Sequence, residues 1–323
     1  MLIRYIFRRT LAGVLVVLGV TVITFVLISS TAGSFVPGLK LNPGLRPEDI
    51  ERIRHNLGLD LPWYLRYFSW LWQLLHGDLG RSLIDGSPVA SHILERLPNT
   101  LELAGTAILI GLLLAIPLGF AGALRRGSSI DSFVTALAVS GVSVPSFWLG
   151  LMLILLFSVQ FEAWGLPWLP SGGATSPVGG GDPLDRAIHL LLPATVLAFG
   201  YLAVWSRFTR SSVIEVLSQD YIRTARAKGM SESRVVWVHA LRNAAMPLIT
   251  LVGLELPSLF GGSAIVEIVF SWPGIGRLAL EHSLEFDYTT VMGITTFVAI
   301  IVVFGNLLAD VVYAFADPRV RLG

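Results

Sequence analysis

The chain has 323 residues, of which 54% are hydrophobic and 14% are charged, and its mean hydropathy is +0.71. A water-soluble surface needs more polar side chains than this, so the composition excludes a soluble protein and predicts that lipid covers much of the chain. The formal net charge of +1 leaves no broad basic face and argues against nucleic acid as a partner. Cysteine is absent, which excludes disulfides, iron–sulfur centres and thiolate zinc sites.

Six apolar runs, most of them near the roughly 20 residues that cross a bilayer as a helix, predict an all-α integral membrane protein with six transmembrane helices. The first run follows a basic start and could also be read as a signal peptide, but its length favours a retained transmembrane helix over residues 1–31. The runs lie at about Thr10–Ser30, Leu103–Leu124, Phe133–Phe157, Leu190–Trp205, Met246–Phe270 and Val291–Phe315.

Residues 32–98, between the first two runs, are predicted to form an external insertion of helical character. Pro47 and Pro62 each open a predicted helix, because proline is favoured at the first helical position. The second helix, at about Trp63–Leu75, is rich in aromatic residues, which suits either an anchor at the lipid interface or a platform for a delivering protein. Another external stretch, 171–182, is rich in Gly and Ser and predicts a flexible loop.

Within the second and third runs, small residues and prolines predict how the helices pack. Gly111, Ala115 and Gly119 recur every four residues, which places them on one helix face where another backbone can approach closely. Pro117 and Pro145 predict either kinks beside a translocation path or ordinary packing in the bundle, of which the second is favoured.

The distribution of charge predicts the topology. Arginine gathers before the first run, after the second, between the fourth and fifth, and at the carboxyl terminus, whereas the loops after the third and fifth runs carry mainly Asp and Glu. Because basic loops stay on the cytoplasmic side, both termini and the segment 207–245 are predicted to be cytoplasmic.

The cytoplasmic segment 207–245 predicts a folded helical hairpin. Asp220 can cap a helix over residues 221–228, Gly229 can end that helix, and Ser231 can cap a second one. The second helix mixes apolar residues with arginine and can dock on another protein. A surface helix pair held by the positive-inside bias would explain the arginines, but not the spacing of Ala and Gly between two caps.

Within this hairpin, TARAKG at Thr224–Gly229 and HALRNAAMP at His239–Pro247 resemble the coupling loop of bacterial ABC importer permeases. Across such permeases the loop reads Glu-Ala-Ala, three residues, Gly, and then Ile-x-Leu-Pro after nine residues. This chain departs from that pattern. Its departures resemble those of the subclass that serves dipeptides, oligopeptides, nickel and glutathione. The matching residues are Ala225, Gly229 and Leu241, and the departing residues are Arg223, Thr224, His239 and Arg242.

Other stretches extend the resemblance to almost the whole chain and are similar to the first permease of that subclass. They are LGLDLPWYLRY at 57–67, HGDLGRSL at 76–83, PVASHILERLPNTLEL at 88–103, FSWPGIGRL at 270–278 and DYTTVMG at 287–293. The resemblance implies a type I ABC importer permease fold in which residues 99–323 form a five-helix permease core. It implies a bacterial cytoplasmic (inner) membrane location and three kinds of partner: a second homologous permease subunit, two ATP-binding subunits, and an extracytoplasmic substrate-binding protein.

The resemblance also implies which residues couple transport to ATP hydrolysis. Gly229 would allow the turn, Ala225 and Ala227 would permit close approach, and the arginines would pair with acidic groups of the ATPase. A basic loop also arises from the positive-inside bias alone. The candidate coupling residues are Asp220, Arg223, Thr224, Ala225, Arg226, Ala227, Gly229, His239, Leu241 and Arg242.

The chain is not expected to be an enzyme. Its only lysines, Lys40 and Lys228, do not stand in a Gly-Lys-Ser/Thr phosphate-binding loop, and neither HExxH nor GxSxG occurs. ATP and Mg are therefore expected in the partner subunits, with no cofactor or metal in this chain. The expected function is translocation of di- or oligopeptides across the cytoplasmic membrane. Nickel, glutathione or another small polar solute is the alternative, and a stand-alone secondary transporter or channel is the rival class.

Glu255, Glu267 and Asp310 are the charges inside the apolar runs. An intramembrane carboxylate is costly, so each is a candidate substrate-path residue, and either Glu255 or Asp310, which lie deeper in their runs, could meet a peptide amino group. For Glu267, near the external end of its run, a rim position in contact with water is an equal alternative. For Glu255 and Asp310, hydrogen bonds that lock the bundle are the favoured alternative.

Overall fold

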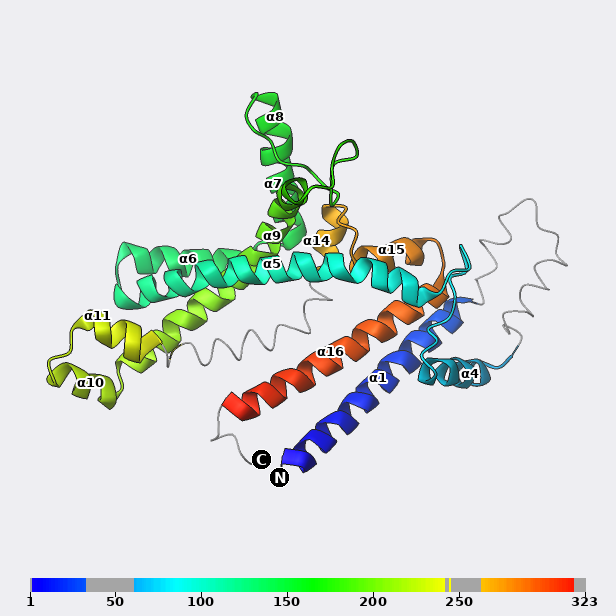
Figure 1. Cartoon of the computed structure of the whole chain (residues 1–323), viewed down its shortest axis with the longest axis horizontal. Coiled ribbons are helices and arrows are strands. Elements are labelled where there is room, and N and C mark those ends of the chain that lie inside the picture. Colours follow the sequence, from blue (N-terminus) through cyan, green and yellow to red (C-terminus); the bar gives the residue numbers. More distant parts are fainter. Residues whose placement is uncertain (1, 33–60, 242–243, 245–262, 317–323) are drawn as a thin grey trace. The chain divides into compact units, whose positions relative to one another are not determined.

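The computed structural model of the chain describes residues 2–32, 61–241, 244 and 263–316 (Figure 1). In this part of the chain the regular elements are helices, and one isolated antiparallel bridge joins Arg81 to Pro88. The prediction of an all-α chain is confirmed for these residues. The helix predicted after Pro47 lies outside them. The chain divides into two compact units, residues 1–98 with 278–307 and residues 99–277 with 308–323.

The first unit contains three apolar helices that pack on one another. Gly13 lets α1 approach α16 closely, since a Cβ at this position would lie 2.4 Å from Val303. Phe25, Tyr67 and Met292 form a buried cluster with one residue from each of the three helices. The three helices are α1 (Leu2–Ala32), α4 (Trp63–Leu75) and α16 (Tyr288–Ala316). The unit also contains the first turns of α5 (Val89–Leu124) and the end of α15 (Ile275–Leu284).

In the second unit α5 and α9 (Pro183–Leu217) pack closely along the predicted strip of small residues. A Cβ at Gly111 would lie 2.9 Å from that of Tyr201, and a Cβ at Gly119 would lie 2.6 Å from that of Thr209. Ala115 between them is fully buried. Any larger side chain would separate the helices, so the close helix contact predicted from the glycine spacing is confirmed.

Five of the described helices are long and apolar enough to cross a membrane. Three of them contain the predicted runs that begin at Thr10, Leu103 and Leu190. The run Val291–Phe315 lies within α16, of which the candidate span covers the part up to Ala309. Most of the predicted run Met246–Phe270 lies outside the described residues, and α14 (Ala264–Val269) is its described end. The five candidate spans are Phe7–Ser30, Val89–Leu124, Ser146–Ala163, Pro183–Leu217 and Tyr288–Ala309.

The predicted span Phe133–Phe157 is interrupted. Val144 and Pro145 have extended backbone, with ψ values of 121° and 133°, so α6 (Ser129–Ser143) ends before α7 (Ser146–Leu153) begins. Proline lacks an N–H group and disfavours helical conformation in the residue before it, which explains the break. The candidate span therefore runs from α7 through the π-helix η1 (Ile154–Gln160) and α8 (Phe161–Ala163). By contrast, Pro117 leaves α5 continuous.

Composition predicted a flexible loop over residues 171–182, but side chains from α9 hold this loop. Asp185 accepts hydrogen bonds from the backbone N–H of Ser176 at 2.9 Å and from its hydroxyl at 2.6 Å. His189, which is buried, lies 3.1 Å from the carbonyl oxygen of Gly172 through its Nδ1 atom. The residues that fix the loop follow it in sequence, which is why its composition alone did not reveal them.

Candidate functional site

The segment predicted to be cytoplasmic opens with a short helix after the end of α9. This helix, α10 (Asp220–Ala227), has Gln219 at its N-cap position, so the predicted cap at Asp220 is wrong by one residue. Asp220 lies instead in the first turn, where its negative charge still stabilises the helix dipole.

Gly229 ends α10, as predicted. Its φ is +80°, its N–H donates to the carbonyl of Arg226 at 2.9 Å, and the N–H of Met230 donates to the carbonyl of Ala225 at 3.3 Å. These two bonds form a Schellman motif, which favours glycine at the residue with positive φ. A Cβ on Gly229 would meet no atom within 4 Å, so backbone conformation and not lack of space favours glycine here.

The second helix of the loop packs back on the first. Ser231 occupies the predicted N-cap position, although its side chain makes no capping hydrogen bond. The chain then forms α11 (Glu232–Arg234) and continues as the π-helix η2 (Val235–Ala240). The predicted helical hairpin is therefore present and has a small core of its own. That core consists of Ile222, Ala225 and Val235, with Leu217 and Met230 packed against it.

The hairpin is also attached to the ends of two long helices. Val236 in η2 is buried in a cluster with Phe120 and Ala123 of α5 and Val213 of α9. Leu241, one of the predicted coupling residues, packs against the same cluster. These apolar contacts pack the hairpin against the ends of α5 and α9.

Ion pairs stiffen the turn between the two helices. Arg226 donates to both carboxylate oxygens of Glu232, at 2.7 Å and 3.2 Å, which joins α10 to α11 across Gly229. These hydrogen bonds lower the pKa of Glu232. Arg223 lies 3.6 Å from Asp220, and both side chains are mostly exposed. Both arginines are thus paired within the loop, but the side chain of Arg223 is 77% exposed whereas that of Arg226 is 41% exposed.

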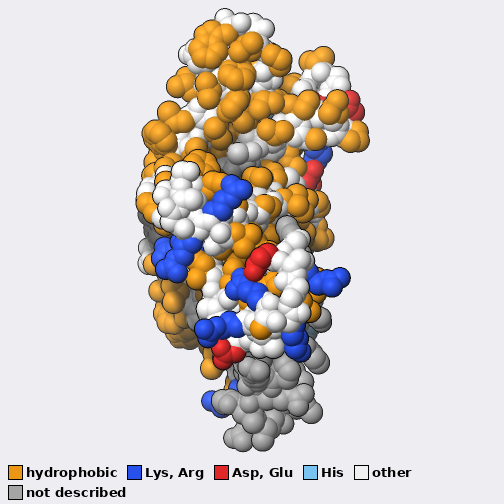
Figure 2. Space-filling model, turned by 90° about the vertical axis from the view of Figure 1, so that its left-hand side faces the viewer, with side chains coloured by type: hydrophobic (Ala, Val, Ile, Leu, Met, Phe, Trp, Pro, Cys, Tyr) orange, Lys and Arg blue, Asp and Glu red, His pale blue; other side chains and the backbone are white. Residues whose placement is uncertain are grey.

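The outward face of α10 is polar and basic. Figure 2 shows the side of the molecule that carries this loop, where Lys and Arg side chains gather and hydrophobic side chains cover the part above them. Ala225 faces the core of the hairpin, so it contributes to internal packing, whereas Ala227 and Thr224 are exposed. The exposed residues of the short helix are Asp220, Tyr221, Arg223, Thr224, Arg226 and Ala227, followed by Lys228.

The remaining predicted site residues are described only in part. His239 lies in η2 and Asp310 in α16, but only their backbone is described. Arg242 and Glu255 lie outside the described residues. The structure therefore brings together the predicted coupling residues from Asp220 to Gly229.

Glu267 has no exposed surface and its carboxylate is surrounded by donors from its own chain. One oxygen accepts from the hydroxyls of Thr100 at 2.9 Å and Ser263 at 3.0 Å. The other accepts from the backbone N–H groups of Gly276 at 2.7 Å and Arg277 at 3.1 Å. The carboxylate thus holds the N-terminal turn of α15 against α14 and α5.

The turn that Glu267 holds explains the FSWPGIGR sequence. Ser271 has a φ of +49°, and a Cβ on Gly274 would lie 2.3 Å from the Glu267 carboxyl carbon, so this glycine leaves room for the carboxylate. Trp272 donates from its indole nitrogen to the carbonyl of Asn99 at 2.9 Å, and the Asn99 amide donates to the carbonyl of Pro273 at 2.8 Å. Sequence reasoning missed this network, although a carboxylate followed by two glycines was a signal for it.

A second buried carboxylate, Asp287, organises the first unit. It accepts hydrogen bonds from the hydroxyls of Ser82 at 2.6 Å and Thr290 at 2.7 Å, and His282 lies 3.0 Å from it. Burial by itself would raise the pKa of Asp287, but the bonds from Ser82 and Thr290 outweigh it and leave that pKa lowered. The stretches HGDLGRSL and DYTTVMG, far apart in sequence, therefore meet at one carboxylate.

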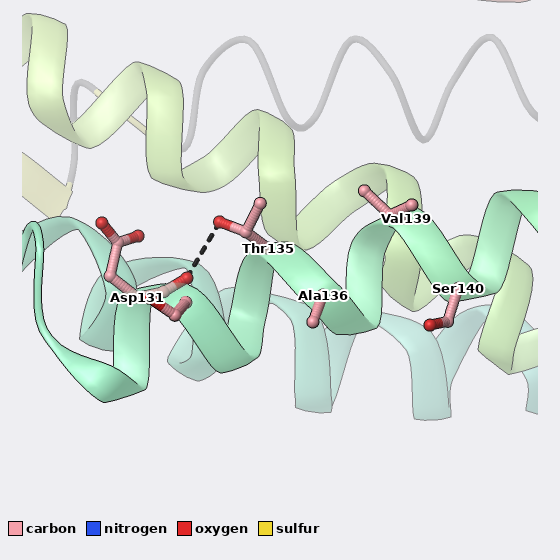
Figure 3. A pocket seen from close by; sticks show the side chains of 6 residues that line it. Asp131, Thr135, Ala136, Val139 and Ser140 are labelled. Carbon is pink, nitrogen blue, oxygen red and sulfur yellow. Dashed lines mark hydrogen bonds between the residues drawn. The ribbon is translucent and has the colours of Figure 1, made fainter.

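A shallow groove runs along α6 and is lined by Asp131, Ser132, Thr135, Ala136, Val139 and Ser140 (Figure 3). At its end the Asp131 carboxylate accepts from Arg210 at 2.9 Å and from the N–H of Gly127 at 2.8 Å. The hydroxyl of Thr135 donates to the Asp131 carbonyl at 2.9 Å. The polar groups at this end of the groove are thus bonded within the chain. No group of three or more His, Cys, Asp or Glu that could hold a metal ion occurs among the residues that the structure describes.

Two protein families together match nearly the whole chain. Residues 107–322 match the family described as binding-protein-dependent transport system inner membrane component, and residues 1–104 match the corresponding N-terminal family. This chain belongs to the binding-protein-dependent transport system inner membrane components. Members of this family are transport components and not enzymes, and the apolar helices agree with a multi-pass inner membrane protein.

Two curated relatives are similar over nearly their full length. The chain is 42% identical over 318 residues to the oligopeptide transport system permease protein AppB of Bacillus subtilis, which covers 98% of this chain and 99% of that protein. It is 38% identical over 341 aligned residues to the dipeptide transport system permease protein DppB of Escherichia coli K12, which covers 99% of both.

Solved structures show the fold. An amino acid ABC transporter crystallised with histidines is 17% identical with a TM-score of 0.52 and covers 70% of this chain and 94% of that one. The inward-facing MetNI methionine ABC transporter is 16% identical with a TM-score of 0.53 and covers 70% of this chain and 96% of that one. The predicted type I ABC importer permease fold is confirmed.

In this inner membrane component, exchanging the charges of Arg226 and Glu232 tests whether Arg226 only holds the turn at Gly229 or is also needed for transport. Either Arg226→Glu or Glu232→Arg alone should loosen the turn at Gly229, and hydrogen exchange of the 217–235 peptide should speed up. The double variant restores the pair and should restore slow exchange. If it does so while transport stays low, the positive charge at position 226 is needed for transport in addition to holding the turn. If the single variants exchange like wild type, the pair does not hold the turn.

The hydrogen-exchange measurement on the Arg226 and Glu232 variants should be made near pH 7. Pairing lowers the pKa of Glu232, so its stabilisation is fully present above the ordinary carboxyl pKa of about 4.3 and is lost as pH falls through the lowered value.

Replacing Glu267 should destabilise the protein in proportion to the donors left unpaired. Glu267→Gln keeps an oxygen for the two backbone N–H groups and should cost about 1–2 kcal/mol, whereas Glu267→Ala should cost at least about 3 kcal/mol. Thermal unfolding of the purified protein in detergent measures both. Glu162→Ala, at an exposed position on α8, is the matched control and should change the stability little. Equal stability of the Ala variant and wild type would contradict the assigned role.

Proposed function

We propose that this chain is a transmembrane permease subunit of an ABC importer that translocates di- or oligopeptides across the cytoplasmic membrane. The observation that carries the proposal is the 42% and 38% identity, over nearly the full length, to relatives named as oligopeptide and dipeptide permeases. The fold that the chain shares with solved ABC transporters supports its assignment to an ABC importer. Nickel or glutathione was the alternative from sequence alone, and the names of these relatives favour peptides.

The proposal requires partners, because the chain has no phosphate-binding loop. They are a second homologous permease subunit, with which this chain forms a heterodimer, two subunits that bind ATP and Mg, and an extracytoplasmic substrate-binding protein. The pore then alternates between two states, and the loaded binding protein and the ATP-bound subunits both favour the outward-open one.

The hairpin from α10 to η2 supports the proposed coupling step. The exposed face of α10 is the surface on which an ATP-binding subunit would dock, and Arg223 projects from it. Val236 joins the hairpin to α5 and α9 through the buried cluster at their ends. Movement of the ATP-binding subunits would therefore pass through η2 into two membrane helices without any contact at the substrate.

We propose different roles for the three carboxylates of the apolar runs. Glu255 and Asp310 are proposed to line the substrate path, where a carboxylate would pair with the amino group of a peptide. Glu267 is proposed to act on the path indirectly, because its carboxylate is saturated by hydrogen bonds within the chain and holds the turn before α15.

The proposed topology has both termini and the α10 hairpin in the cytoplasm and residues 32–98 and 171–182 outside. Single cysteines test it, since the chain has none of its own. Val178→Cys, at a side chain that is 91% exposed, should react with an impermeant maleimide in intact cells. Lys228→Cys should react only after permeabilisation. The opposite pattern would invert the topology.

Gly229→Val tests coupling. A β-branched residue reaches a φ of +80° only at a cost of about 1 kcal/mol or more, so the docking surface should be misshapen. Uptake of a radiolabelled tripeptide should fall severalfold, and stimulation of ATP hydrolysis by the loaded binding protein should be lost, while the protein inserts at normal abundance. A strain without the chain should lose tripeptide uptake but keep nickel accumulation.

The matched control is Gly179→Val, because Gly179 has a φ of +70°, equally open surroundings and an external position. It carries the same strain and should leave coupling intact. If Gly229→Val kept wild-type uptake and stimulation, the coupling role would be wrong. If the null strain lost nickel accumulation instead of tripeptide uptake, the peptide substrate would be wrong.

A further inference from the structure

Helix α4 exposes an unusual amount of apolar surface for a segment outside the candidate spans. Its 13 residues contain one charged side chain, Arg66, and no acidic one. The exposed large apolar residues are Trp63, Tyr64, Leu65, Phe68, Trp72 and Leu75. A contiguous surface of this kind normally contacts a protein, a ligand or a membrane.

The residues of α4 divide among three faces at about 100° per residue. One face packs inward, where Tyr67 is buried with Phe25 of α1 and Met292 of α16, and Trp70 and Leu71 pack against them. A second face is apolar and exposed, with Phe68 and Trp72 at its centre. Exposed Ser69 and Gln73 share the third face with Arg66. Adjacent apolar and polar strips, both exposed, are the pattern of a helix that lies in the plane of a membrane surface.

The contacts of the inward face give the depth of α4. The Tyr67 hydroxyl lies 3.0 Å from the Thr21 hydroxyl, and the rings of Tyr67 and Trp70 lie 5.4 Å and 6.5 Å from that of Phe25. Both α1 residues lie inside the candidate span, which ends at Ser30. At 1.5 Å per residue, Phe25 is about 8 Å and Thr21 about 14 Å from that end. A helix packed on this part of α1 lies below the end of the span.

Interfacial helices bury their apolar face roughly 5–10 Å into the boundary between lipid headgroups and acyl chains, which agrees with the depth of about 8 Å at Phe25. Thr21 lies deeper and is reached by the hydroxyl at the tip of the Tyr67 side chain. Over the same turns α1 itself exposes Ile23 and Val26. Trp and Tyr are favoured at this level because their rings are amphipathic.

We propose that α4 is an interfacial helix whose exposed apolar face contacts lipid at the membrane surface, and that it thereby anchors the segment before α5 to the bilayer. Lipid is a better occupant than a water-soluble protein, because a partner arriving from water could reach this face only by displacing lipid from beside α1. The polar strip of Ser69 and Gln73 faces the headgroups and water, and Arg66 beside it places its guanidinium over the ring of Phe25. The inference concerns the membrane and does not depend on which solute is transported.

Depth measurement by spin labelling tests the proposal, because the chain has no cysteine of its own. The full chain, purified with the subunits that accompany it, carries a nitroxide at Trp72→Cys or at Ser69→Cys and is placed in nanodiscs of phosphatidylethanolamine and phosphatidylglycerol. Oxygen concentrates in lipid and the neutral nickel chelate Ni-EDDA in water. The label at position 72 should therefore show a ratio of oxygen to nickel accessibility severalfold above that at position 69.

Three other outcomes would overturn the proposal. Equally low ratios at positions 69 and 72 would place the apolar face in water, and equally high ratios would contradict the division of α4 into a lipid-facing face and a polar face. Low accessibility of position 72 to both reagents would mean that protein covers it. If Trp72→Cys does not insert, Leu75→Cys on the same face replaces it, with Gln73→Cys as its matched polar control.

Discussion

A carboxylate enclosed within an apolar chain must obtain its hydrogen-bond donors from that chain, because neither lipid nor bulk water supplies them. Glu267 meets this constraint with two hydroxyls and two backbone N–H groups drawn from α5, the start of α14 and the turn into α15. Asp287 meets it in the first unit with the hydroxyls of Ser82 and Thr290. In each unit, segments far apart in sequence are brought together by the donors that one buried carboxylate requires.

The same requirement shapes the hairpin from α10 to η2. Its turn satisfies the last carbonyls of α10 through the N–H groups of Gly229 and Met230, and the ion pair of Arg226 with Glu232 joins the two helices. The apolar contacts of Ile222 and Val235 close the hairpin, and those of Val236 tie it to α5 and α9. The hairpin is therefore packed against two long helices on one side and is exposed and basic on the other.

Helix contacts inside the second unit depend on the size of the side chains between the helices. Gly111 and Gly119 allow α5 to touch α9, and the packing of that pair places the apolar cluster that receives Val236. Pro145 ends α6 and lets a new helix begin at Ser146, so the apolar run there becomes two helices and not one. The hairpin is thus packed on α5 and α9, and these two helices are packed closely on each other.

Sequence alone determined the features that depend on local chemistry. Apolar runs predicted the membrane helices, the spacing of Gly111, Ala115 and Gly119 predicted a close helix contact, and Gly229 predicted the end of α10. Each of these follows from residues within a few turns of one another, where side-chain type decides the backbone conformation or the helix face.

Tertiary structure decided what depends on distant residues. It decided that Arg226 is paired with Glu232, that Ala225 faces inward, that the loop 171–182 is held by Asp185 and His189, and that Glu267 is saturated by donors up to 167 positions away. A carboxylate in an apolar run looks the same in sequence whether it faces a path or a ring of donors. Only the folded chain supplies those donors, so only the folded chain distinguishes the two.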